Sequence, residues 1–250
     1  MTAALQTREL GRSFGGYRAL GNVNLTLSAG ARHALIGPNG AGKTTLINLL
    51  TGTLQPSHGE IFLDGHNVTG SRTDMRVKRG LARTFQINTL FADLTALETV
   101  LLAVTERRGA AGNWWSSRSR QTAATEEALQ VLASIGLDCV AGVKTREMPY
   151  GRQRLLEIAL ALACKPNILL LDEPAAGVPS GESAELFDAI ARLPRDVTVL
   201  FIEHDMNLVF RFAERITVLV AGEILVEGSP AEIAADPKVR EVYLGKASHV

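Results

Sequence analysis

A run of nine residues, GPNGAGKTT at positions 37–45, combines three glycines with one lysine and two threonines. It matches the spacing G-x-x-x-x-G-K-S/T without a gap. Gly40 and Gly42 let the backbone turn and approach a ligand without a Cβ in the way. The N–H groups at a helix start and the ammonium of Lys43 attract phosphate oxygens, and the hydroxyl of Thr44 suits Mg²⁺. The run predicts a site for a nucleoside triphosphate with Mg²⁺.

The elements expected on either side of this run are those that a phosphate loop needs. Residues 33–36, a histidine followed by three apolar residues, predict a buried strand, and residues 44–51 predict the helix that follows it. The alternative, a glycine-rich turn with no ligand, fits this context poorly. The residues expected to hold the nucleotide are Gly37, Pro38, Asn39, Gly40, Ala41, Gly42, Lys43, Thr44 and Thr45, with Thr44 also a Mg²⁺ ligand.

Two carboxylates, Asp172 and Glu173, follow directly on the apolar run of residues 168–171. A buried carboxylate without a partner is costly, and the Mg²⁺ of a bound nucleotide is the partner that the sequence suggests first. We expect Asp172 to be a Mg²⁺ ligand and Glu173 to polarise the attacking water. Two acidic residues at an exposed strand end are the alternative, which the phosphate loop makes less attractive. The pair predicts hydrolysis of the nucleotide as well as binding.

Short apolar runs alternate with helical patterns, which indicates parallel strands covered by helices. Residues 168–171 and 197–202 predict two buried strands, and apolar positions at helical spacing predict a helix over residues 182–193 between them. This strand–helix–strand unit is typical of a doubly wound sheet. The sequence therefore predicts an α/β core with a parallel sheet.

Other stretches predict antiparallel strands or helices. Those that predict antiparallel strands are residues 19–27, residues 61–63 before the Asp64-Gly65 turn, and residues 216–220 and 224–226 around Gly222. Residues 95–163 are mostly helical by pattern, with one apolar stripe at Leu129, Leu132 and Ile135. We therefore expect the α/β core to carry an antiparallel β layer and an inserted helical subdomain.

Composition bounds the partners. Lysine plus arginine and aspartate plus glutamate number 26 each, so the net charge is zero, which gives no sign of a nucleic-acid partner. No apolar run approaches the ~20 residues that span a bilayer. The N-terminus lacks the apolar stretch of a secretory signal. Cys139 and Cys164 have no metal-ligand spacing, and we expect both to be small buried thiols of a reducing compartment.

Four further segments resemble the ATP-binding cassette of ABC transporters, and they occur in that family's order. They are SFGG at residues 13–16, RTFQ at 83–86, YGRQ at 150–153 and IEHD at 202–205. The resemblance covers essentially the whole chain. It implies an α/β fold with a P-loop NTPase (RecA-like) parallel-sheet core, an antiparallel β subdomain and an inserted helical subdomain. We expect one domain over residues 1–250, with the core at 1–87 and 164–250 and the helical subdomain at 88–163.

The resemblance also implies roles for single residues. Phe14 occupies the position whose ring stacks on adenine, and an aromatic face suits a base. Gln86 matches the glutamine that contacts Mg²⁺ and the attacking water and senses the membrane subunit. His204 matches the histidine that hydrogen-bonds the γ-phosphate. The expected catalytic residues are therefore Glu173, His204 and Gln86, and the expected Mg²⁺ ligands are Thr44, Gln86 and Asp172.

The segment that closes over the ATP of a second cassette departs from the family pattern Leu-Ser-Gly-Gly-Gln. Here it continues from Met148 as Pro149, Tyr150, Gly151 and Arg152, which we call the signature segment. Pro149 has neither hydroxyl nor N–H, so part of the contact with the γ-phosphate is expected to be missing, while Gly151 remains available. Pro179 likewise stands where the family carries an aspartate that helps to couple the two sites. Together these departures suggest two unequal composite sites, as in a heterodimer.

Within the family, several stretches resemble the branched-chain amino-acid class of importers. They are RTFQ, PYGRQRLLEIALAL, EPAAG, IEHDM and the tail VREVYLG. The resemblance implies a second ATPase subunit that is probably a different chain, two membrane permeases and, indirectly, a periplasmic or extracellular binding protein. It implies a peripheral position on the cytoplasmic face of the bacterial inner membrane, with ATP and Mg²⁺ as cofactors. Urea or amide import and lipopolysaccharide export are the alternatives for the cargo.

A soluble cassette ATPase that acts on nucleic acid or ribosomes is the rival from another class. Such proteins usually carry tandem cassettes, a long coiled coil or a basic tail, and this sequence shows none of these. A basic run precedes the RTFQ segment and is most simply interpreted as a solvated face, with docking to a permease or to acidic headgroups as the alternative. It comprises Arg72, Arg76, Lys78, Arg79 and Arg83. Trp114 and Trp115 fit either a membrane interface or internal packing.

Overall fold

The computed structural model describes residues 3–84, 90–109 and 118–244. Gln86, Trp114 and Trp115, which the sequence analysis singled out, lie outside these ranges. Among the described residues, six strands form one sheet in the order β11-β10-β4-β9-β8-β7. Their bounds are β4 (Arg32–Ile36), β7 (Leu81–Arg83), β8 (Ile168–Asp172), β9 (Thr198–Ile202), β10 (Arg215–Val220) and β11 (Glu223–Gly228).

This sheet is parallel from β10 to β7, and β11 is added at one edge by an antiparallel hairpin. The helix α6 (Ser180–Ala191) connects β8 to β9, so the predicted strand–helix–strand unit is confirmed. Successive side chains of β8 enter opposite hydrophobic clusters, Ile168 and Leu170 on one face and Leu169 and Leu171 on the other. The continuous apolar run is therefore buried on both faces, as the sequence predicted.

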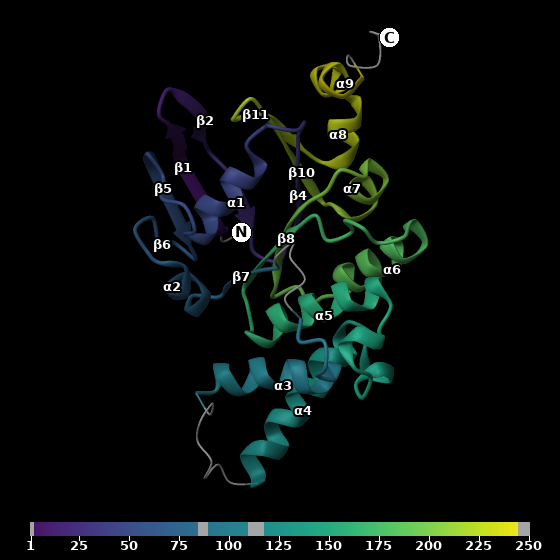
Figure 1. Ribbon diagram of the computed structural model, residues 1–250. Helices are drawn as coiled ribbons and strands as arrows, with labels where there is room; N and C mark the ends of the chain where they lie inside the picture. The colour runs from purple at the N-terminus through teal and green to yellow at the C-terminus, as the bar shows by residue number, and fades with distance from the viewer. Residues whose placement is uncertain (1–2, 85–89, 110–117, 245–250) are drawn as a thin grey trace.

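A second, antiparallel sheet covers one face of the first, as Figure 1 shows at the left. Its strands are β1 (Ala3–Phe14), β2 (Tyr17–Val23), β3 (Thr26–Ser28), β5 (His58–Leu63) and β6 (His66–Asn67). Between the sheets lies α1 (Lys43–Thr51), whose Leu46, Ile47 and Leu50 share a core with β1 and β8. The predicted antiparallel layer therefore lies over the helix that follows the phosphate loop.

The predicted single strand over residues 19–27 is wrong, because two strands occupy it. β2 ends at Val23 and β3 begins at Thr26. Between them the chain turns around the side chain of Thr7 in β1, whose hydroxyl donates to the Val23 carbonyl and accepts from the Leu25 N–H. The side-chain hydroxyl of Thr7 thus satisfies backbone groups of Val23 and Leu25 where the strand is interrupted.

The other face of the six-stranded sheet packs against helices. They are α5 (Tyr150–Ala163), α6 and α7 (Met206–Phe212), with α3 (Ala96–Arg107) and α4 (Arg118–Ser134) packed beyond α5 (Figure 1). Two 3₁₀ turns, at Asp138–Val140 and Thr145–Glu147, complete this helical part, and α2 (Thr73–Lys78) precedes β7. The chain ends in α8 (Pro230–Ala235) and α9 (Pro237–Leu244).

Some side chains of the helical part lie elsewhere than predicted. Leu132 and Ile135 are buried, but Leu129 of the same predicted stripe is 39% exposed. Cys139 is exposed and Cys164 is half-buried, so the expectation of two buried thiols is wrong for Cys139. Cys139 falls in a short 3₁₀ turn outside the helical stripe, where the periodicity of its neighbours says nothing about burial.

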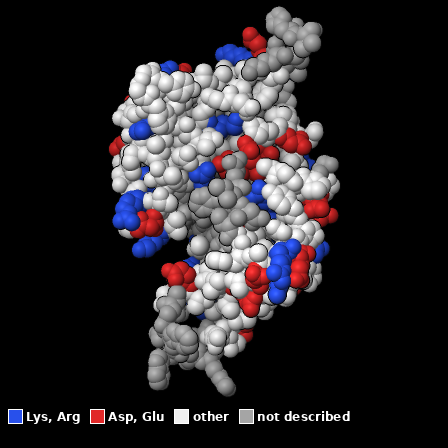
Figure 2. All heavy atoms as spheres, in the orientation of Figure 1, with Lys and Arg blue, Asp and Glu red and all other residues white. Residues whose placement is uncertain are grey.

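The surface matches the zero net charge. Figure 2 shows acidic and basic side chains interspersed on the side in view, with no continuous basic face there. Among the described residues no helix is long and apolar enough to cross a membrane.

Candidate functional site

The phosphate loop, residues 37–45, turns between the end of β4 and the start of α1. Gly40 and Gly42 have φ angles of 78° and 102°, in the left-handed region that favours glycine. A Cβ at Gly42 would lie 2.8 Å from both the Ala19 carbonyl oxygen and a methyl group of Leu20. Both the backbone conformation and the close approach of β2 therefore require glycine at this turn.

Lys43 is bound to its own loop in this structure. Its Nζ donates to the carbonyl oxygens of Gly37, at 2.7 Å, and Pro38, at 3.1 Å. Burial lowers the pKa of Lys43, and the negative charges of Glu173 and Asp172 oppose that shift. The Lys43 ammonium thus lies against the phosphate loop, where two backbone carbonyls accept its hydrogen bonds.

A hollow of about 280 Å³ opens in front of the loop. It is lined by Phe14, Tyr17, Ala19, Asn39, Gly40, Ala41, Gly42, Lys43, Thr44, Thr45, Glu173 and His204. Phe14 is 46% exposed, and the Arg12 guanidinium lies 4.7 Å from the centre of its ring. Sequence reasoning missed Tyr17, which is directly opposite Phe14 in the β1–β2 hairpin. The sequence did offer a signal for it: Tyr17 follows Phe14 by three residues, across the Gly15-Gly16 turn, as paired residues of a tight hairpin do.

Asp172 is buried at the end of β8 and paired with an arginine. The Arg83 Nη2 lies 2.8 Å from its Oδ2, and the Arg83 Nη1 donates to the Asn48 side chain at 2.7 Å. The sequence prediction named Mg²⁺ as the first partner of the buried Asp172 carboxylate and therefore overlooked Arg83. β7 and β8 are neighbours in the sheet, so Arg83 and Asp172 lie at the same edge. The sequence alone did not show that pairing.

Glu173 and His204 meet at the edge of the hollow. The Glu173 Oε1 and the His204 Nε2 are 2.6 Å apart, and Glu173 has a φ of 49°, unusual for a residue with a side chain. Behind them lies Glu203, which sequence reasoning also missed. Its carboxylate accepts from the backbone N–H groups of Ala175 and His204. Burial raises the pKa of Glu203, and these two hydrogen bonds oppose the rise. Glu203 therefore links the loop after Glu173 to His204.

Gln86, expected on Mg²⁺ and the attacking water, lies outside the described residues. The described chain before it ends at Thr84, whose N–H donates to the Leu170 carbonyl. Of the expected Mg²⁺ ligands, Thr44 lines the hollow and Asp172 is buried at the end of β8, and hydroxyl and carboxylate oxygens are of the type that Mg²⁺ prefers. Among the described residues no three His, Cys, Asp or Glu side chains gather as a metal site. The donor set fits an ion that is held mainly by phosphates.

The signature segment lies outside this hollow, at the start of α5. Pro149 is the residue before the helix and its side chain makes no cap. The Tyr150 hydroxyl donates to the Ala176 carbonyl at 3.4 Å. The Gly151 N–H donates to the Glu182 Oε2 at 3.2 Å. In this structure a carboxylate from α6 accepts the Gly151 N–H, and the availability of Gly151 to a γ-phosphate stays a prediction.

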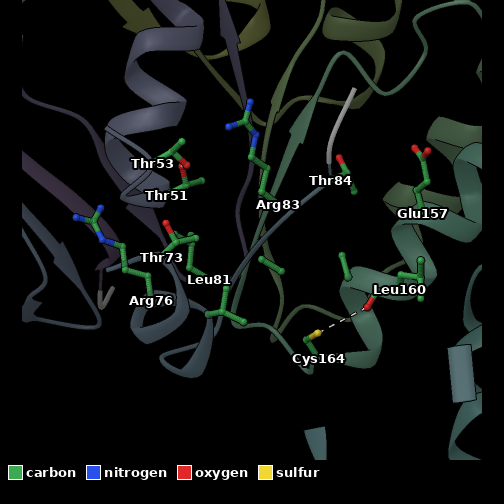
Figure 3. A pocket seen from close by; sticks show the side chains of 13 residues that line it. Thr51, Thr53, Thr73, Arg76, Leu81, Arg83, Thr84, Glu157, Leu160 and Cys164 are labelled. Atoms are coloured by element: carbon green, nitrogen blue, oxygen red, sulfur yellow. Dashed lines mark hydrogen bonds between the residues drawn. The ribbon is translucent and has the colours of Figure 1, made fainter. Parts of the chain in front are cut away.

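A second cavity, also of about 280 Å³, lies between α2, β7 and α5. Figure 3 shows Arg83 at the end of β7 and Thr84 just after it, with Glu157 and Leu160 on α5 opposite. Arg76 lines it and is fully buried. Its guanidinium donates to four backbone carbonyls, those of Leu49, Leu50, Thr69 and Ser71. The interpretation of the basic run as a solvated face is therefore wrong for Arg76, which donates to buried backbone carbonyls, and for Arg83, which pairs with Asp172.

Comparisons with known proteins agree with this geometry. A family model described as "ABC transporter" matches residues 20–176, and one described as "Branched-chain amino acid ATP-binding cassette transporter" matches residues 223–249. The high-affinity branched-chain amino acid transport ATP-binding protein BraF of Pseudomonas aeruginosa is 39% identical over 97% of this chain and 98% of its own. The corresponding LivG of Escherichia coli K12 is 41% identical over 94% of each chain.

Solved structures show the same likeness. The ADP conformation of an ATP-binding cassette of an ABC transporter has a TM-score of 0.84 and 28% identity, with 98% of this chain and 100% of that chain covered. A dimeric post-hydrolysis cassette bound to ADP and Pi has a TM-score of 0.72 and 27% identity, with 90% of this chain and 98% of that chain covered.

Proposed function

This chain belongs to the ATP-binding family of ABC transporters, whose members hydrolyse ATP, and we propose that it energises the import of branched-chain or related amino acids. The observation that carries the cargo class is the match of residues 223–249 to a family model of branched-chain amino-acid cassettes. The similarity to BraF and LivG over nearly the whole of each chain supports it.

We propose that the hollow in front of the phosphate loop holds the nucleotide. Its aromatic mouth, Phe14 and Tyr17, presents two rings that suit adenine. Residues 37–45 cradle the phosphates, and Lys43 exchanges the Gly37 and Pro38 carbonyls for phosphate oxygens. Because this exchange replaces two neutral acceptors by charged ones, it strengthens the hydrogen bonds of Lys43.

Hydrolysis on this proposal uses the pair at the edge of the hollow. Glu173 polarises the attacking water, and His204, held 2.6 Å from it, turns toward the γ-phosphate. Thr44, Asp172 and Gln86 would hold Mg²⁺, which neutralises charge on the phosphates when bound. Arg83 orients the Asp172 carboxylate, and Glu203 holds the His204 backbone in place. Arg83 and Glu203 thus orient residues that act on the nucleotide, Asp172 and His204.

The general composition of the transporter follows from the family, because its ATP-binding subunits dimerise and work with membrane permeases. We propose that the partner cassette is a different chain and that two permeases and an external binding protein complete the importer. The chain would then lie on the cytoplasmic face of the membrane. We further propose that residues 88–163 form one helical subdomain and that residues 1–87 and 164–250 form the core.

Uptake measurements test the cargo. In cells that lack the chromosomal copy, uptake of radiolabelled leucine, isoleucine and valine is expected to fall and to return with the wild-type gene but not with Lys43→Ala. Lys238→Ala, which changes an exposed lysine on α9, is the control and is expected to restore uptake. Loss of urea, amide or lipid transport with unchanged leucine uptake would contradict the proposed cargo.

A further inference from the structure

The helix α5 begins without a capping side chain of its own. Pro149 stands in the capping position, where the family pattern has serine, and it makes no side-chain hydrogen bond. The first N–H groups of a helix have no partner inside the helix, so a side chain, water or ligand must accept from them. Gly151 carries one of these N–H groups. The loss of serine therefore leaves a donor that something else must satisfy.

Glu182 satisfies it from the neighbouring helix. Its Oε2 accepts from the Gly151 N–H at 3.2 Å, and a Cβ on Gly151 would lie 2.4 Å from the same oxygen. A side chain at position 151 would therefore displace the carboxylate. Glu182 also lies in the first turn of α6, which begins at Ser180 and whose N-cap residue Pro179 likewise makes no side-chain cap. The carboxylate thus lies near two helix starts, both of which favour negative charge.

No lysine or arginine among the described residues forms an ion pair with Glu182. Arg152 and Glu185 line a surface hollow together with Glu182, and neither forms a hydrogen bond or ion pair with its carboxylate. Among the described residues the Glu182 carboxylate thus accepts from the backbone N–H of Gly151, and it occupies the place of an anion at the start of α5.

We propose that Glu182 is the positioning residue of the signature segment: it caps α5 while the cassette is alone and releases the Gly151 N–H to the γ-phosphate of the partner's ATP as the dimer closes. This inference rests on the composite site of the proposed function. A carboxylate and a phosphate are both negative, so they cannot share one N–H without repulsion. Closure therefore requires Glu182 to move or to lose its charge.

The same residue connects two segments that act at the site. Glu182 lies three positions after Pro179, where the family carries a coupling aspartate, and the Tyr150 hydroxyl contacts the Ala176 carbonyl in the loop between Glu173 and Pro179. Displacement of Glu182 by a partner's phosphate would therefore act on the segment that follows Glu173. This supplies a route between the two sites that does not need the missing aspartate.

An ATP titration tests the exchange. In the Glu173→Gln background, which keeps ATP bound, association of this chain with the partner cassette is followed by light scattering against ATP concentration. Adding Glu182→Gln keeps an oxygen acceptor for Gly151 and removes the charge, so the half-saturating ATP concentration for dimer formation is expected to fall about three- to tenfold. Glu185→Gln, which removes an exposed charge one turn further along α6, is the matched control and is expected to stay within about twofold.

Each outcome decides. Equal half-saturating concentrations for Glu182→Gln and its parent would overturn the exchange. Nucleotide binding to each cassette with no ATP-dependent association of the two in any variant would instead contradict the composite site of the proposed function, and the exchange with it. Thermal unfolding tests the cap separately: Glu182→Ala is expected to lower the melting temperature, and Pro149→Ser is expected to recover part of the loss. An unchanged melting temperature for Glu182→Ala would refute the cap.

Discussion

At the scale of single residues, the phosphate loop was predictable and its support was not. The spacing of Gly40, Gly42 and Lys43 is a local pattern, and the structure places these residues at the hollow. Arg83 and Arg76 instead act through contacts with residues far along the chain, Asp172 and the end of α1. A charge run in a sequence does not show which of its members face inward, so both were assigned to solvent.

Lys43→Ala is expected to weaken ATP binding about tenfold or more, because hydrogen bonds to charged groups contribute about 1.5–3 kcal/mol each. Equilibrium binding of a fluorescent ATP analogue to the purified chain measures this. Lys238→Ala, an exposed change on α9, serves as the control. An affinity close to that of the wild type would show that Lys43 stays on the Gly37 and Pro38 carbonyls when nucleotide binds.

Glu173→Gln is expected to lower steady-state phosphate release about 10²- to 10⁴-fold while ATP still binds, since the amide cannot accept a proton from water. Phosphate release and nucleotide binding are measured on the same preparation. A rate near that of the wild type would assign the activation of water to another group.

At the scale of elements, strands with a regular pattern were predictable and irregular ones were not. The run over residues 168–171 and the hairpin around Gly222 lie where the sequence put them. β1 escaped prediction although it is twelve residues long. Glu9 has a φ of 46°, and the pairing of β1 shifts register near Gly11, so its side chains do not alternate regularly between the faces.

The C-terminal helix α9 also reaches the phosphate loop, which no local pattern indicates. The backbone N–H of Gly37 donates to the Tyr243 hydroxyl, and burial nevertheless raises the pKa of Tyr243 to about 12. A Cβ on Gly37 would lie 2.1 Å from the Leu219 carbonyl oxygen, so β10 confines the same residue from another side. The loop therefore begins at a point that two C-terminal elements fix.

Tyr243→Phe keeps the ring and removes the hydroxyl. It is expected to weaken ATP affinity about two- to tenfold with the melting temperature nearly unchanged, because one net hydrogen bond contributes about 0.5–1.5 kcal/mol. Nucleotide titration and thermal unfolding are compared with those of Glu241→Gln, an exposed change on the same helix. Wild-type affinity in Tyr243→Phe would limit the role of Tyr243 to packing.

At the scale of the whole molecule, one buried network ties the stability of the central sheet to pH. His33 on β4 is fully buried, and its Nε2 lies 2.7 Å from the Thr217 hydroxyl on β10, which donates to Glu227 on β11. Burial lowers the pKa of His33 from 6.5 to about 4, with Glu227 opposing the shift and Arg215 adding to it. His33 is therefore neutral in the folded chain near neutral pH.

A lowered pKa means that this stability is present above the unfolded value of 6.5 and is lost as the pH falls toward about 4. Between about pH 7.5 and about pH 5.5, His33 is expected to cost about 1 kcal/mol of unfolding free energy, because only the unfolded chain takes up the proton. His33→Gln can still donate to Thr217 and does not titrate, so its loss over this interval is expected to be smaller by that amount. Urea unfolding at both pH values measures the difference, and equal losses would exclude His33 as the source.

The exposed thiol of Cys139 gives the native chain a handle for spectroscopy. The sequence has two cysteines, and Cys164 is half-buried with a pKa that burial raises, so it forms the reactive thiolate less readily. A maleimide dye is therefore expected to attach first at Cys139, in the helical part of the chain. A dye at Cys139 would report the approach of the partner cassette to this helical part in real time, without any engineered residue in this chain.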